Sequence, residues 1–286
     1  MFDVALFNMF YLQLRNELWK LFGKKRTYIG FVAFLLAQIG MMLAFRSERW
    51  QRSFERLLSG NGYVAAEFLS ALTVAVVMLI PQIALLMPLY TTLVGGDLVA
   101  KESEDGTLRM ILSRPISRVR LLFVKWVAGC IFSLLLVLVL GMIALGVARL
   151  LFPWKSMFVF NPGTAFCILT AHDGFWHYLL AQVFMSVNAC VSFSIAFMFS
   201  CLNIKPAAAT IVALTILLAS LVLEAIPAFD TYENWMVTHH FKVWLNAFQS
   251  PLPWPQIGES EIILVAVATS CFVIGCTAFQ VRDIKS

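Results

Sequence analysis

Six long runs of this chain contain no Asp, Glu, Lys or Arg, and each approaches or exceeds the length of a membrane span. A hydrocarbon core about 30 Å thick needs roughly 20 helical residues. The runs are continuously apolar, whereas the strands of a membrane barrel would alternate polar and apolar residues over about 10 positions. The pattern therefore predicts an all-α polytopic membrane protein with six transmembrane helices. The runs are 27–45, 68–96, 126–148, 178–204, 206–223 and 262–281.

The segment before the first run has a one-sided helical pattern. When 1–26 is projected at about 100° per residue, most apolar side chains fall within one arc, and Glu17 and Lys20 lie opposite. We expect an amphipathic interface helix on the cytoplasmic membrane surface, although a cytosolic extension of the first span is an alternative. This predicts an interface helix at 1–26 and a six-span domain at 27–286.

Two prolines, Pro81 and Pro88, interrupt the second run. Each proline removes a backbone donor and clashes with the preceding turn, so we expect a kinked or broken helix. Irregular backbone at membrane depth is tolerated where protein or water satisfies it. The two prolines are therefore candidates for lining a transport route, with a purely structural role as the alternative.

Two further segments, 156–171 and 228–257, are too short or too broken to span. The first contains Asn-Pro-Gly at 161–163, and the second contains three tryptophans, which favour the membrane interface. We expect re-entrant or surface-lying helices on the outer side. If either segment crossed the membrane, the two termini would lie on opposite sides. The tryptophans are Trp235, Trp244 and Trp254.

Composition and charge support this picture. Hydrophobic residues make up 60% of the 286 positions and charged residues 13%, less charge than a soluble domain carries. Lys and Arg are concentrated on the side of the termini, so we expect a multi-pass protein of a prokaryotic plasma (inner) membrane with both termini cytoplasmic. The net charge of +5 suits anionic membrane lipids, and we expect no nucleic acid partner. Four arginines of the first outer loop oppose the trend: Arg46, Arg49, Arg52 and Arg56.

The chain offers little sign of chemistry of its own. It has no G-x-x-x-x-G-K-[ST] phosphate loop, no G-x-S-x-G and no H-E-x-x-H. Its six cysteines lack a C-x-x-C pair, which favours a packing role. His172 and His177 could share a helical face, but a metal site normally needs more ligands. We therefore expect no catalytic residues, no metal site and no cofactor in this chain.

The segment 95–125, which we call the elbow, is a dense polar stretch between two apolar runs. Gly95 and Gly96 would let the chain leave the membrane, and acidic residues precede Gly106 and Thr107. A short helix carrying Leu108, Met110, Ile111 and Leu112 would follow and would end at Pro115. This predicts a rigid, amphipathic cytoplasmic elbow; an ordinary structured loop is the alternative.

At these residues the sequence resembles the type-2 ATP-binding cassette (ABC) export permeases. The shared features are an acidic pair, a Gly-Thr-Leu step, a Ser-x-Pro-x-x-Arg turn and a Lys entering the next span. The match is specific over the elbow and extends loosely to the whole chain. In this chain the features are Glu102, Glu104, Gly106, Thr107, Leu108, Ser113, Pro115, Arg118 and Lys125.

The resemblance implies a permease subunit that exports a hydrophobic or amphipathic substrate such as a drug, peptide or lipid. Two permease chains, identical or homologous, would assemble with two copies of a separate ABC ATPase, which would hold the ATP and Mg. Closure of the ATPases would push on the elbows, and kinked second and fifth spans at the dimer interface would open a route.

In that assembly the elbow would dock on the ATPase. Glu102 and Glu104 would pair with basic groups of the ATPase, and Leu108 and Ile111 would supply apolar docking area. Two other functions stay open: an ion-coupled secondary transporter, weakened because no pair of buried carboxylates marks an ion relay, and a membrane enzyme built around the outer histidines. The coupling residues implied are Glu102, Glu104, Gly106, Thr107, Leu108, Ile111, Pro115 and Arg118.

Overall fold

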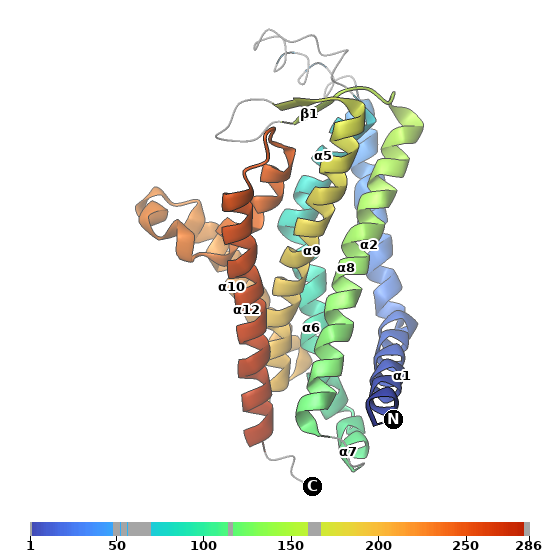
Figure 1. The fold of residues 1–286 in the computed structure, drawn as a ribbon, viewed down its shortest axis with the longest axis vertical. Helices are drawn as coiled ribbons and strands as arrows, with labels where there is room; N and C mark the ends of the chain where they lie inside the picture. Colours follow the sequence, from blue (N-terminus) through green and yellow to red (C-terminus); the bar gives the residue numbers. More distant parts are fainter. Residues whose placement is uncertain are drawn as a thin grey trace.

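The computed structural model describes residues 2–47, 52, 56, 70–113, 117–159 and 167–282. Within these residues, six helices are long and apolar enough to cross a membrane, and they run side by side as one elongated bundle (Figure 1). The six predicted spans are therefore confirmed as helices. Their bounds are Thr27–Arg46, Ala71–Glu104, Arg118–Leu151, Ala171–Cys201, Pro206–Glu224 and Trp254–Val281.

The first helix, α1 (Phe2–Gly23), is separate from α2 (Lys25–Arg46), which contains the first span. The extended backbone of Lys24 separates them, and the Thr27 hydroxyl donates to the Leu21 carbonyl at 2.6 Å across the junction. Leu21 is buried where α1 packs against the beginning of the third span. An interface position of α1 stays a prediction.

The second span is broken where the sequence places its prolines. An α-helix, α5 (Ala71–Pro81), leads into a π-helical turn, η1 (Gln82–Leu86), and the α-helix resumes as α6 (Met87–Glu104). The break thus begins after Pro81 and ends just before Pro88. A π turn accommodates the missing backbone donor by changing the hydrogen-bond register.

The fourth span, α9 (Ala171–Cys201), lies at the centre of the bundle, between α8 (Arg118–Leu151) and α12 (Trp254–Val281) in Figure 1. Small residues allow α6 to approach its neighbours closely. A Cβ on Gly95 would lie 2.5 Å from the Phe193 carbonyl oxygen of α9, and one on Gly96 would lie 2.3 Å from Thr210 of α10 (Pro206–Glu224).

These contacts correct one expectation. Gly95 and Gly96 do not turn the chain out of the bundle: they lie inside α6, which continues to Glu104. Glycines in membrane helices commonly mark close helix packing, and this role applies here.

The two outer segments differ from each other. In the first, β1 (Met157–Val159) pairs antiparallel with β2 (Cys167–Leu169), with Phe158 opposite Ile168. In the described residues of this segment, 156–159 and 167–171, the expected helix is therefore wrong, because two short apolar stretches can satisfy their backbones by pairing.

The second outer segment is helical, as expected. It forms η2 (Pro227–Trp235), α11 (Val237–His240) and η3 (Phe241–Phe248). Trp235 is 85% exposed, as an interfacial residue would be, but Trp244 is buried against the bundle. An interfacial position is thus wrong for Trp244, because η3 packs its apolar side onto the protein.

One end of the bundle carries the short helix α7 (Thr107–Leu112) together with α1 and the last residues of α12 (Figure 1). We call this the elbow end.

Candidate functional site

The turn of the elbow is built by residues that its backbone requires. Gly106 has φ of +73°, a left-handed conformation that glycine adopts without strain. Its N–H donates to the Ser103 carbonyl at 3.3 Å, and the Thr107 hydroxyl donates to the Glu102 carbonyl at 3.2 Å. Gly106 and Thr107 therefore end α6 and begin α7, as the sequence predicts.

The helix α7 has an inner and an outer side. Leu108 is 1% exposed and packs into the core at the elbow end, with Ile111 partly buried beside it. Met110, in contrast, is 67% exposed. The expectation that Leu108 offers docking area is therefore wrong: Leu108 anchors α7 to the bundle, and Met110 is the apolar side chain that α7 presents outward.

Four charged side chains from three helices meet behind the elbow. Lys125 of α8 is fully buried, with its Nζ 2.9 Å from Glu17 Oε2 of α1 and 2.8 Å from Glu102 Oε1 of α6. Lys20 Nζ lies 2.7 Å from Glu17 Oε1 and 3.4 Å from Glu102 Oε1. We call Glu17, Lys20, Glu102 and Lys125 the charge cluster.

The contacts of the charge cluster favour the ionised forms of Glu17 and Lys20. Burial by itself would raise the pKa of Glu17, but the ammonium groups of Lys125 and Lys20 more than offset it and hold that pKa below its ordinary value. Burial would likewise lower the pKa of Lys20, yet Glu17 and Glu102 raise it above its ordinary value. The cluster thus brings two acidic and two basic side chains together at one site.

This geometry changes the role of the acidic pair. The Glu102 carboxylate is mostly buried and paired inside the chain. Glu104 is half exposed and lies 3.3 Å from Lys101, which also lies 3.4 Å from Asp105. The expected pairing of Glu102 with a partner protein conflicts with its burial, and the accessible acidic surface consists of Glu104 and Asp105.

Two arginines connect the elbow to the end of α12. Arg118 donates to the carbonyls of Gln280 and Arg282, both at 3.2 Å. Arg282 in turn donates to Ser103 Oγ and to Asn203 Oδ1, both at 2.7 Å. Nothing local in the sequence links Arg282 to Ser103, so this contact could not be predicted from the sequence. Pro115 lies outside the described residues.

The helix break is held by polar contacts inside the bundle. Gln38 Nε2 of α2 donates to Gln82 Oε1 at 3.2 Å and to the Leu140 carbonyl of α8 at 3.0 Å. Both glutamines are buried, Pro88 is buried, and Pro81 is exposed. The π turn is thus fastened to two neighbouring spans; a route-lining role of the prolines stays a prediction.

The outer histidines make structural contacts. His177 Nδ1 contacts the Ala247 carbonyl, and His240 lies 3.2 Å from Ser260 and 3.0 Å from the Asn234 carbonyl. In the part of the chain that the structure describes, no three His, Cys, Asp or Glu side chains gather as metal ligands would.

Comparison with known proteins agrees with the fold. A family model described as ABC-2 family transporter protein matches residues 14–242, which include the second half of α1, the elbow and five of the six spans. No curated protein matches the chain. Because the matched segment covers well over half of the sequence, the chain belongs to the ABC-2 transporter family and is a multi-pass membrane permease component.

Proposed function

We propose that this chain is the permease subunit of an ATP-driven exporter and that a separate ABC ATPase docks on its elbow. The charge cluster is the observation that carries the proposal. Salt bridges connect Glu102, just before the α6–α7 turn, to Lys125 in the third span, and Lys125 to Glu17 in α1. Force applied to the elbow would therefore reach two other helices without first deforming a flexible loop.

The docking surface would be the outward side of the elbow. Met110 of α7 supplies an exposed apolar side chain, and Glu104 and Asp105, at the turn before α7, supply accessible negative charge. An exposed apolar anchor beside charges suits a specific protein contact, in which the anchor contributes affinity and the charges contribute orientation. Gly106, Thr107, Leu108 and Arg118 would hold this surface in place, and Ile111 would lie at its edge.

The proposed assembly has two permease chains, identical or homologous, and two ATPase subunits in a prokaryotic inner membrane, with the elbow and both termini cytoplasmic. ATP and Mg would bind the ATPase, and this chain would need no cofactor. A hydrophobic or amphipathic substrate is supported by the apolar interior of the spans, where the buried lysine, Lys125, is paired. Among the described residues of the spans, no paired carboxylates suggest ion coupling.

The test is co-purification from native membranes in mild detergent, followed by an ATPase assay. Wild-type protein should retain ATPase activity, and the variants M110E and E104K/D105K should lose it. The variant E259K, an exposed charge reversal near the other end of the bundle, is the matched control and should keep it. Retention of the ATPase by both elbow variants would overturn the docking assignment. Ion-gradient-driven transport by ATPase-free protein would favour a secondary transporter.

A further inference from the structure

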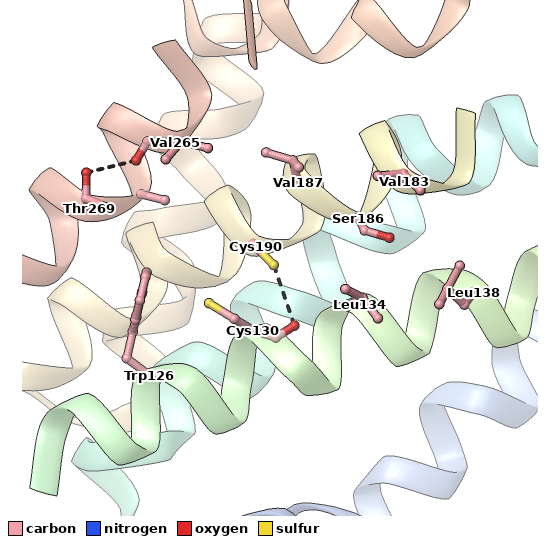
Figure 2. A pocket seen from close by; sticks show the side chains of 11 residues that line it. Trp126, Cys130, Leu134, Leu138, Val183, Ser186, Val187, Cys190, Val265 and Thr269 are labelled. Atoms are coloured by element: carbon pink, nitrogen blue, oxygen red, sulfur yellow. Dashed lines mark hydrogen bonds between the residues drawn. The ribbon is translucent and has the colours of Figure 1, made fainter. Parts of the chain in front are cut away.

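A furrow runs along the bundle where α8, α9 and α12 meet (Figure 2). Its volume is about 310 Å³, at the small end of the 300–1,000 Å³ typical of ligand sites. The α9 helix forms its floor, and α8 and α12 form its walls. Because all three helices are membrane spans, the furrow lies at membrane depth.

The length of the furrow can be followed on α8. Its lining residues there are Trp126, Cys130, Leu134 and Leu138, spaced four apart on one side of the helix. Twelve residues at about 1.5 Å per residue give a length of roughly 18 Å. Trp126 is the first residue of the charge-free run, so the furrow extends inward from the hydrocarbon boundary at the elbow end. This length is close to one leaflet of hydrocarbon, about 15 Å.

The chemistry of the lining is apolar even where side chains carry polar atoms. The Thr269 hydroxyl donates to the Val265 carbonyl at 2.9 Å, and the Ser186 hydroxyl donates to the Gln182 carbonyl at 2.7 Å. The Cys190 thiol contacts the Cys130 carbonyl at 3.5 Å (Figure 2). These groups already form hydrogen bonds with the helix backbone. A polar group on an occupant would therefore gain no hydrogen bond from them.

The furrow is closed at one end and open at the side. The rings of Trp126 and Phe272 have centroids 5.0 Å apart, which joins α8 to α12 at the elbow end. Farther along, Leu134, Val183 and Val265 on its rim are all more than a third exposed. Access is therefore lateral, from within the bilayer.

These dimensions exclude other occupants. An apolar cavity of this kind is a poor site for water. A helix from a second copy would be about 10–12 Å across with its side chains and would need several times this volume over the same length. A single extended hydrocarbon chain fits both the volume and the length.

We propose that the furrow binds one acyl chain of a bilayer phospholipid from the leaflet at the elbow end. The chain enters sideways between α8 and α12, and its headgroup stays at the level of Trp126. Burial against the three helices holds this lipid longer than the lipids that surround the bundle, because apolar contact area is gained on several sides at once.

The experiment uses the full chain reconstituted in phospholipid vesicles that contain a phospholipid with a photoactivatable diazirine in one acyl chain. After illumination, labelled peptides are mapped. Labelling should concentrate on the lining segments of α8, α9 and α12, above the level at the exposed side of α2 around Leu36, which is 63% exposed. Two variants that fill the furrow, A268F and V187F, should lose the concentrated labelling.

The matched control is L36F, which places the same ring on the exposed side of α2 and should leave furrow labelling unchanged. Gel-filtration profiles and thermal midpoints of all variants show whether each is folded. One folded filling variant is enough to test the proposal. Equal labelling of the furrow and the exposed α2 surface would show surrounding lipid only and would overturn the proposal. Undiminished labelling in a folded filling variant would do the same.

Discussion

Lys125 Nζ lies 2.9 Å from Glu17 Oε2, although 108 positions separate the two residues in the chain. The contact joins the third span to the helix that precedes the first span. Lys125 is fully buried, so its charge depends on Glu17 and on Glu102 for compensation. The elbow, α1 and α8 therefore form one electrostatic unit at the elbow end of the bundle.

Removing the central cation should destabilise the protein strongly. In K125L, the carboxylates of Glu17 and Glu102 lose the fully buried ammonium group that contacts both of them, and breaking a buried ion pair in this way costs about 3–5 kcal/mol. Thermal unfolding in detergent, followed by loss of the monodisperse gel-filtration peak, should show a clearly lowered midpoint. The control K101L removes a lysine from surface pairs with Glu104 and Asp105, where solvent screens the charges, and should leave the midpoint close to that of the wild type.

A compensating variant separates charge from packing. If uncompensated carboxylates cause the loss, adding E17Q and E102Q to K125L should recover part of the stability, because no anion is then left buried without a cation. A triple variant less stable than K125L alone would instead assign the effect to lost packing.

The charge cluster also predicts a pH dependence. The pKa of Glu17 is lowered from its ordinary value of 4.5, so its contribution to stability is complete above 4.5 and is lost as pH falls through the lowered pKa. The pKa of Lys20 is raised from 10.5, so its contribution is complete below 10.5 and is lost as pH rises through the raised value. The contribution should therefore be flat around neutral pH.

Thermal midpoints measured from neutral pH to well below 4.5 check this. Wild-type protein should lose more stability on acidification than E17Q, which has no carboxyl group to protonate at this position. Parallel acid profiles for the two proteins would show that Glu17 does not contribute through its charge.

Gly106 sets the angle between α6 and α7. In G106A, a β-carbon meets no neighbouring atom within 4 Å, so the cost is the left-handed backbone alone, about 1–2 kcal/mol. G106N should cost less, because asparagine adopts this conformation more readily. Protease sensitivity of the elbow should rise in the order wild type, G106N, G106A. The control G146A, in a helix with open space around the site, should not raise it.

The sequence predicted the membrane spans well, but it did not predict which charged side chains are buried and paired. A long apolar run predicts a membrane helix from composition alone. The two prolines indicated where the second span breaks, because the loss of a backbone donor acts on the turn in which the proline lies. Glycine followed by threonine located the turn at Gly106 for the same reason. Glu17 and Glu102, however, look like surface residues in any local pattern. Their burial depends on Lys125, and only the packed bundle brings these three together.

The same distinction explains the other differences. Leu108 and Met110 are both apolar residues of one short helix, and the sequence alone does not say which of them faces the bundle. The link between Arg282 and Ser103 joins positions 179 apart. In each case the residue type was visible in the sequence, but its partner was set by tertiary packing.

The glutamine pair at the helix break offers a last test. In Q82L, Gln38 Nε2 loses one of its two acceptors and keeps the Leu140 carbonyl, so the cost should be near the average for a hydrogen bond in a membrane protein, about 0.6 kcal/mol. Q38L should cost more, because it removes both hydrogen bonds and leaves the Gln82 amide buried without its partner. The double variant Q38L/Q82L should be no less stable than Q38L, since no polar side chain then remains unpaired at this contact. Thermal midpoints of the three variants measure this directly. Strictly additive losses in the double variant would show that the two glutamines do not act as a pair.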